Sequence, residues 1–314
     1  MNEPYKYIFG PVPSRRLGLS LGIDLLGNKI CSMDCVYCEV GKTKILTLKR
    51  GEYVPTESVL KELQDFIINL KGEKPNYITF SGMGEPTLHS RLGYIIDKIH
   101  EMTDVPVCVL TNSTTIVLDD VFNELLKADV VIPSLDALGE ETVCKLNKPM
   151  QGVNFQKIIQ RLSDFKKVFK GKIYIEILFV KGINDNDSEL KVLNEALKII
   201  NPDGLQIHTV ARPSMAGYAD PVSDSFLVYA RNFFSIYSAK VEAFSGINKA
   251  VYETETDMVT ALLKIRPCHF DEISNSTGIS KDKLKSLLKK LDESGSVTKI
   301  NFNNLTYYKV VSDK

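Results

Sequence analysis

Short apolar runs alternate along this chain with longer segments in which apolar residues recur every three or four positions. The short runs are rich in β-branched residues, which is typical of buried strands. The longer segments have the spacing of amphipathic helices; in residues 59–70 and again in residues 155–169, the apolar side chains share one helix face. We predict strands at residues 77–80, 107–110, 130–132, 173–180 and 205–210, and a sixth strand ahead of Cys31.

This alternation predicts an α/β domain built from repeated strand–helix units. Consecutive units of this kind place their strands parallel in one sheet, and the apolar helix faces pack on that sheet. In barrels made from such units, reactive side chains gather at the carboxyl ends of the strands. Residues that follow the predicted strands are therefore the first candidates for a functional site.

The pattern changes near residue 255. Residues 257–264, 270–277 and 280–293 have helical spacing, and residues 297–300 and 307–311 are predicted to form a hairpin that turns at Asn303 and Asn304. Three helices and a hairpin indicate a winged helix-turn-helix, in which Gly278 ends the second helix and Ser280 caps the third. We predict two domains, residues 1–250 and 251–314.

The charge of the predicted winged helix leaves its role open. Its third helix carries five lysines: Lys281, Lys283, Lys285, Lys289 and Lys290. From residue 257 to 314 there are ten Lys and Arg against seven Asp and Glu, which is a modest excess. A contact with DNA or RNA, a solvated lysine face and a protein-docking module all agree with that balance.

Composition restricts the class of protein. The 314 residues are 44% hydrophobic and 25% charged, with a formal net charge of zero. These values are typical of a globular protein with one sizeable core. No apolar run approaches the roughly 20 residues that a membrane-spanning helix needs, so no membrane contact is expected. The neutral charge balance does not suggest a general nucleic-acid binder.

Three cysteines carry the chemistry. Cys31, Cys35 and Cys38 are separated by three and then two residues. Thiolates are the usual protein ligands of iron–sulfur clusters, and a four-iron cluster held by three of them keeps one iron open to another ligand. A disulfide framework is typical of small secreted domains, and structural zinc needs a fourth ligand that the nearby sequence does not supply. An oxygen-sensitive cluster with reduced thiols predicts a cytoplasmic location.

The sequence resembles the radical S-adenosylmethionine (radical SAM) superfamily. The resemblance rests on the cysteine spacing, on Tyr37 directly before the third cysteine, and on the element Ser-Gly-Met-Gly-Glu-Pro at residues 81–86. The run at residues 10–18 is similar to the subgroup related to tRNA wyosine-forming enzymes. The family implies a partial (β/α)6 TIM-type barrel, a [4Fe-4S] cluster, S-adenosylmethionine, and flavodoxin or ferredoxin as electron donor.

The resemblance also implies roles for individual residues. Tyr37 is expected near the adenine, and the element that contains Gly82, Gly84 and Glu85 is expected to hold the methionine amino group. Ser134 is expected at the cofactor ribose. Further cofactor roles fall to Asp136 near the ribose and to Asn184 beside the methionine carboxylate. For Asp136 an ordinary helix-capping role is the alternative.

Other candidates come from their position at strand ends. Glu176 lies in an apolar strand, where a carboxylate needs either a structural salt bridge or a polar ligand, so it is a candidate cofactor-binding residue. His208 shares a face with Gln206 and is either a structural residue or a proton-transfer residue, and Asn112 at a strand end is a similar candidate. Arg15 and Arg16 either grip a substrate phosphate or carboxylate or anchor their own loop.

Two functions are consistent with these motifs. The first is a radical SAM enzyme that cleaves S-adenosylmethionine reductively and uses the 5′-deoxyadenosyl radical to take hydrogen from a nucleotide or RNA, a protein or a small molecule. The second is a redox-sensing regulator whose cluster controls DNA binding by the winged helix. Glu85 and the loop at Asn184 favour the enzyme, because a sensor needs neither. Cys108, Cys144 and Cys268 lie in separate elements, so no second cluster and no wyosine reaction are inferred.

Overall fold

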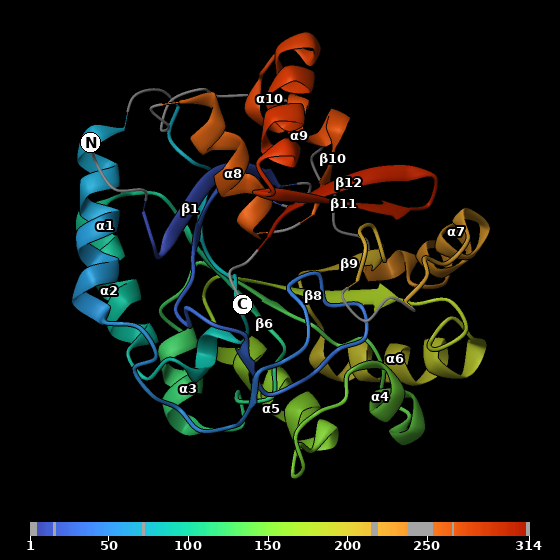
Figure 1. Cartoon of the computed structure of the whole chain (residues 1–314). Coiled ribbons are helices and arrows are strands. Elements are labelled where there is room, and N and C mark those ends of the chain that lie inside the picture. The colour runs from blue at the N-terminus through green and yellow to red at the C-terminus, as the bar shows by residue number, and fades with distance from the viewer. Residues whose placement is uncertain are drawn as a thin grey trace.

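A seven-stranded sheet forms the main body of the molecule (Figure 1). The computed structural model describes residues 5–14, 17–70, 73–214, 219–237, 254–265 and 267–311. Within these residues the strand order is β1-β2-β5-β6-β7-β8-β9, with β1 antiparallel to β2 and every other neighbour parallel. The strands are β1 (Ile8–Ser14), β2 (Gly18–Ile23), β5 (Tyr77–Phe80), β6 (Val107–Thr111), β7 (Val130–Pro133), β8 (Lys172–Phe179) and β9 (Gly204–Thr209).

The six parallel strands are those that the sequence predicts. The sixth, β2, ends at Ile23, which is several residues before the first cysteine. The edge strand β1 is not among the predicted strands, because Pro11 and Pro13 argue against a strand. One side of an edge strand makes no ladder hydrogen bonds. Prolines, which lack an N–H donor, are therefore tolerated in β1.

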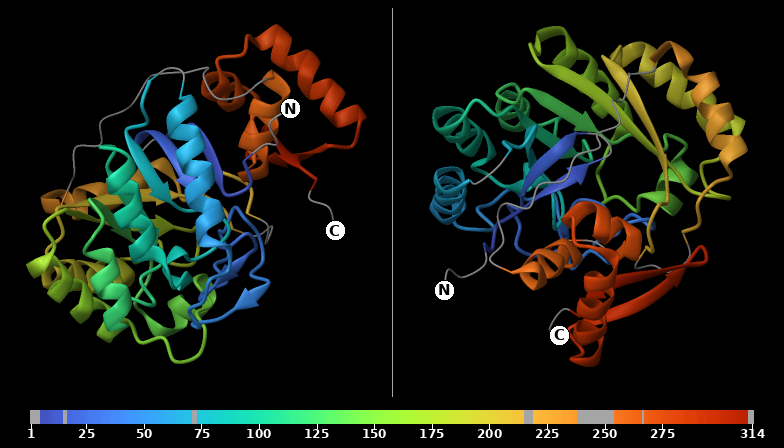
Figure 2. Two further views of the ribbon diagram at one scale, coloured as in Figure 1. Left: turned by 90° about the vertical axis from the view of Figure 1, so that its left-hand side faces the viewer. Right: turned by 90° about the horizontal axis from the view of Figure 1, so that it is seen from above.

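Helices cover the outer face of the curved sheet (Figure 2). The longer helices lie on the sheet through apolar stripes; in α1, for example, Val59, Leu63 and Phe66 are buried. The barrel helices are α1 (Thr56–Asn69), α2 (Leu92–Met102), α3 (Asp119–Leu125), α4 (Glu140–Leu146), α5 (Phe155–Val168), α6 (Asp187–Ile200) and α7 (Asp224–Phe233). The main apolar core lies between these helices and the strands. The structure therefore confirms an α/β fold whose sheet is mostly parallel.

The described residues from 254 to 311 form three helices and a small sheet around an apolar core, here called the C-terminal unit (orange and red in Figure 1). Its helices are α8 (Glu255–Ile265), α9 (Phe270–Thr277) and α10 (Lys281–Glu293), and its sheet has the order β10-β12-β11, from Cys268–His269, Leu305–Val310 and Val297–Phe302. The helices and the hairpin lie where the sequence places them, and β10 is an additional strand. Ser280 stands at the N-cap position of α10 without a side-chain hydrogen bond. Residues 250 and 251, which flank the predicted domain boundary, lie outside the described residues.

The C-terminal unit packs on the barrel beside the loop that carries Cys31, Cys35 and Cys38, here called the cysteine loop. Val12 of β1 contacts its apolar core, and the Tyr307 hydroxyl donates a hydrogen bond of 3.0 Å to the carbonyl of Ala211. Phe302, at the end of β11, packs against a small apolar cluster that includes Val36. Among the described helices, none combines the length and the apolar character that crossing a bilayer would require.

Candidate functional site

The cysteine loop lies at the carboxyl ends of β2 and β5. Cys31 ends the short strand β3 (Ile30–Cys31), which pairs in parallel with β4 (Ile45–Leu46). Ile30 fixes β3 to the element at residues 81–86, here called the glycine-rich element. Its amide donates to the carbonyl of Met83 at 3.2 Å, and its carbonyl accepts from the amide of Glu85 at 3.1 Å. The three thiols are near enough to influence one another electrostatically. The fold thus brings the two main sequence motifs together.

Each of the three thiols faces a nitrogen donor. The Lys29 ammonium is 3.0 Å from Cys38 Sγ. Side-chain amides supply the other two contacts: Asn112 Nδ2 is 3.4 Å from Cys31 Sγ, and Asn147 Nδ2 is 3.5 Å from Cys35 Sγ. Donors of this kind stabilise a thiolate and tune the cluster that it holds.

Burial opposes ionisation of two of these thiols, those of Cys31 and Cys35. It raises the pKa of Cys31 to about 11, while the nearby Lys29 ammonium acts in the opposite direction. Among the described residues, no three His, Cys, Asp or Glu side chains converge as they would on a single metal ion. Three buried or half-buried sulfurs, each with its own N–H donor, fit the thiolate ligands of an iron–sulfur cluster.

Two of these donors are not predicted from the sequence. Lys29 lies two residues before the first cysteine, and this short separation is a signal that could indicate its proximity to the loop. Asn147 is far from the cysteines in sequence and follows α4, so no local signal indicates its contact. Asn112 is a candidate from its position after β6, and the structure places it against Cys31 and 2.9 Å from Ser32 Oγ.

The glycines of the element at residues 81–86 are required by close packing. Gly82 and Gly84 have φ angles of +118° and +157°. A Cβ atom at residue 84 would lie 1.8 Å from the carbonyl oxygen of Ile30, and one at residue 82 would lie 2.9 Å from Asp24 Cβ. Glycine at residue 84 therefore lets this element approach the strand that carries Cys31, and glycine at residue 82 lets it approach Asp24.

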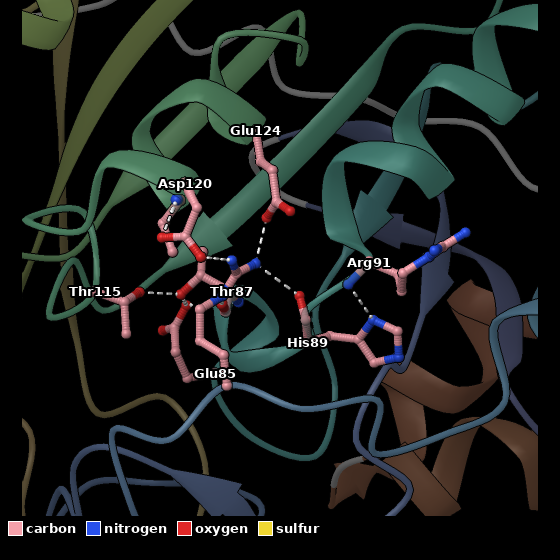
Figure 3. A network of polar contacts seen from close by, with 9 residues as sticks. Glu85, Thr87, His89, Arg91, Thr115, Asp120 and Glu124 are labelled. Atoms are coloured by element: carbon pink, nitrogen blue, oxygen red, sulfur yellow. Dashed lines mark hydrogen bonds and ion pairs between the residues drawn. The ribbon is translucent and has the colours of Figure 1, made fainter.

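Glu85 is buried and accepts four hydrogen bonds; Figure 3 shows it beside Thr87. Its Oε1 accepts from the hydroxyls of Thr87 and Thr111 at 2.6 and 2.8 Å and from the Thr87 amide at 3.1 Å, and its Oε2 accepts from the Asn112 amide at 2.6 Å. Burial raises the pKa of this carboxyl, and the four donors oppose the rise. Glu85 therefore joins the element at residues 81–86 to the end of β6, next to Asn112.

Arg50 supports the same element from outside. Its guanidinium donates to the carbonyls of Thr87 and His89, both at 3.0 Å, and forms ion pairs with Asp120 and Glu124 of α3. Arg50 is mostly shielded from solvent, at 11% side-chain exposure. It connects the segment after the cysteine loop to the residues that follow Glu85. Nothing in the sequence pattern indicates this role.

A second network joins Tyr37 to the end of β7. The Tyr37 hydroxyl donates to Asp136 Oδ2, which also accepts from Asn147 Nδ2 at 2.9 Å. Asp136 Oδ1 accepts from the Leu178 amide at 2.9 Å. The two residues expected at the adenosine part of the cofactor are thus in contact. The helix-capping alternative for Asp136 is wrong, because α4 begins at Glu140 with Gly139 at its N-cap.

Burial raises the pKa of Asp136 to about 6, against several opposing hydrogen bonds. Between about pH 4 and pH 6 the folded protein then binds more protons at this site than the unfolded chain does, so stability falls as the pH rises. Two pKa units correspond to at most about 3 kcal/mol. We expect Asp136→Asn to flatten this part of the pH profile. Urea unfolding of the cluster-free proteins between about pH 4 and pH 6 measures the free energy of unfolding at each pH. Equal slopes against pH for the variant and the wild type would contradict the expectation.

Asn184 braces the same region. Its side chain is fully buried; Nδ2 donates to the carbonyls of Asp136 and Leu178, both at 2.9 Å, and Oδ1 accepts from the Val180 amide at 2.7 Å. These bonds tie the loop after β8 to the ends of β7 and β8. The backbone around Asp136 is therefore held from two sides.

The interior of the barrel contains a carboxylate and an imidazole. Ser134 pairs with Glu176 in a parallel bridge between β7 and β8. His208 on β9 places its Nε2 3.7 Å from Glu176 Oε1, and both side chains are partly exposed. The structure therefore brings these three predicted residues together. Arg15 and Arg16 lie outside the described residues.

Comparisons with known proteins agree with this geometry. Residues 27–191 match the family model described as the Radical SAM superfamily. The chain is 34% identical over 310 residues to a protein named GTPase Obg from Brachyspira hyodysenteriae, covering 97% of this chain and 45% of that protein. It is 30% identical over 308 residues to a UPF0026 protein of Methanocaldococcus jannaschii, covering 96% and 94% of the two chains.

Solved structures resemble the barrel. Streptococcus suis SuiB bound to S-adenosylmethionine superposes with a TM-score of 0.52 at 15% identity, over 69% of this chain and 47% of SuiB. At that identity the likeness concerns the fold. The family model, in contrast, covers more than half of this chain and includes all three cysteines. This protein therefore belongs to the radical SAM superfamily, whose members bind a [4Fe-4S] cluster and S-adenosylmethionine.

Proposed function

We propose that this protein is a radical SAM enzyme with one [4Fe-4S] cluster held by Cys31, Cys35 and Cys38. With cluster and cofactor bound, the chemistry supplied is one-electron cleavage of S-adenosylmethionine to a 5′-deoxyadenosyl radical, which takes a hydrogen atom from a substrate. The observation that carries the proposal is the meeting of three N–H-bonded thiols with the glycine-rich element at the mouth of the barrel.

The residues of this chain would orient the cofactor. Gly84 lets its element approach the cysteine strand, Gly82 lets it approach Asp24, and Glu85 fixes the element through its hydrogen bonds. We assign the adenosine end to the neighbourhood of Tyr37 and Asp136, whose contact supports that assignment. When a site holds both ends of a ligand, the reactive centre of that ligand is fixed in position.

The substrate would enter the barrel near Ser134, Glu176 and His208. A carboxylate beside an imidazole can hold or move a proton at neutral pH. We therefore propose His208 as the proton-transfer residue, with Glu176 setting its orientation. We propose from the sequence alone that Arg15 and Arg16 contact an anionic group of the substrate. Three classes of substrate agree with this site: a nucleotide or RNA, a protein, and a small molecule.

The C-terminal unit is proposed to be a winged helix that makes protein contacts. Several lysines expected to follow a phosphate backbone form ion pairs instead: Lys281 with Asp271 at 2.7 Å, and Lys283 with Glu255 at 2.8 Å. Such pairing lowers the positive potential that nucleic-acid binding needs. This favours the enzyme over the DNA-binding regulator. An oxygen-sensitive cluster supports a reducing compartment, the cytoplasm.

The proposed function is tested by product formation. Anaerobically reconstituted and chemically reduced protein should convert S-adenosylmethionine to 5′-deoxyadenosine and methionine, detected by chromatography. With a labelled substrate, deuterium should appear in 5′-deoxyadenosine. A fully loaded, reduced sample that forms no 5′-deoxyadenosine would exclude the enzyme, and cluster-dependent retardation of a DNA duplex without the cofactor would favour the regulator.

A further inference from the structure

An exposed patch of apolar and basic side chains borders the cysteine loop. It consists of Lys42, Lys44, Ile45, Leu46 and Lys49, here called the cluster-loop patch. Ile45 and Leu46 are 48% and 42% exposed although both are large apolar residues, and the three lysines around them are exposed as well. Large exposed apolar side chains with basic residues around them are typical of a surface that binds another protein.

The backbone of this patch is bonded directly to the strand that carries a cluster ligand. Leu46 is the parallel partner of Cys31, and the Thr47 amide donates to the Cys31 carbonyl at 2.9 Å. The Lys44 amide donates to the carbonyl of Lys29 at 2.9 Å. Because paired strands lie about 4.8 Å apart, a protein seated on Leu46 would come very near the cysteine loop.

The lysines of the patch form no close ion pairs with described residues, although the Asp34 carboxylate lies against this segment and accepts from the Thr43 amide at 2.7 Å. In the part of the chain that the structure describes, no carboxylate forms an ion pair with Lys42, Lys44 or Lys49. Lysines elsewhere on the surface commonly have such partners, as Lys74 has Asp104 and Lys127 has Asp97. Three ammonium groups in an eight-residue segment attract an acidic partner and orient it during its approach.

From these observations we propose that the cluster-loop patch is the docking surface for a small acidic one-electron carrier protein. The inference rests on the proposed function, which requires the cluster to be reduced. In the step, the reduced carrier loses one electron and the oxidised cluster gains it, so no further reactant is needed. The apolar centre favours a protein over nucleic acid, because Ile45 and Leu46 offer no aromatic face on which bases could stack.

The experiment compares two matched double variants of the cluster-loaded protein. The first combines Lys44→Glu with Leu46→Ser in the patch. The control combines Lys191→Glu with Val192→Ser on α6, where an exposed lysine also precedes an exposed apolar residue. Reduction of the cluster by reduced flavodoxin is followed by stopped-flow absorbance at low and high salt, and reduction by dithionite is measured in parallel.

We expect the patch variant to react with flavodoxin about tenfold or more slowly at low salt, with a smaller difference at high salt. The control variant should match the wild type, and dithionite should reduce all three proteins equally. Flavodoxin rates that are unchanged in the patch variant, or lowered as much in the control, would overturn the docking site. If the patch variant lost binding to RNA while these reduction rates stayed unchanged, the docking proposal would be overturned and the patch would be a nucleic-acid site. Failure of the proposed function would be seen separately, because the wild-type protein reduced by dithionite would then form no 5′-deoxyadenosine.

Discussion

Replacing Cys35 with alanine should reduce the iron content of the reconstituted protein to background and abolish formation of 5′-deoxyadenosine. Cys35 is one of three thiols on the loop, and Asn147 donates to its sulfur. Loss of a residue that merely orients a metal ligand typically costs about 10- to 100-fold in metal affinity or activity. Loss of the ligand itself should therefore exceed about a hundredfold. Iron analysis, visible absorbance and product chromatography measure the effect.

Cys144 provides the control for this experiment. It is an exposed cysteine on α4, outside the loop. The substitution Cys144→Ala should leave the iron content and product formation at wild-type values. If Cys35→Ala kept its cluster, or if both variants lost it equally, the ligand assignment would be wrong.

Replacing Arg212 with alanine should separate the C-terminal unit from the cysteine loop. The Arg212 guanidinium bonds both oxygens of Glu39, at 3.0 and 3.2 Å, and also pairs with Glu272 of α9. Glu39 directly follows the third cysteine, so this one side chain joins the loop to the C-terminal unit. Arg212 is only 9% exposed.

Removing one partner of a buried ion pair leaves a carboxylate without compensation, which typically costs about 3 to 5 kcal/mol. Because Glu39 is one-third exposed, we expect the lower end, about 3 kcal/mol, in the free energy of unfolding. Urea unfolding measures this loss. Limited proteolysis should cut residues 254–311 faster in the variant, and the cluster should bleach faster in air.

Arg161 offers a matched control. It also pairs with a carboxylate, Asp119, but that carboxylate is 87% exposed. Exposed pairs contribute about 0 to 1 kcal/mol, and the stacking of the guanidinium on Phe122 at 3.9 Å adds about 0.5 to 1 kcal/mol, so Arg161→Ala should cost less than Arg212→Ala. Equal protease resistance of the Arg212→Ala variant and the wild type would show that the C-terminal unit is held by other contacts.

The sequence alone determined the elements and the main chemical motif. The parallel strands and the amphipathic helices were predictable because burial of alternate faces imposes a periodicity that local residues must follow. Cys31, Cys35 and Cys38 could be recognised as candidate cluster ligands because all three stand in one short loop. Their position near Gly82 and Gly84 followed from the rule that the carboxyl ends of parallel strands meet at one edge. The edge strand β1 escaped prediction because its prolines contradict strand propensity and only its place in the sheet permits them.

Only the tertiary structure decided which side chains surround that motif. Asn147 approaches Cys35 across more than a hundred residues of sequence, and Arg212 reaches Glu39 from still farther away. Such contacts depend on how strand ends and loops converge in space, and they leave no periodic trace along the chain. Periodicity records which face of an element is buried, whereas a polar contact between distant loops is fixed by the packing of the whole barrel.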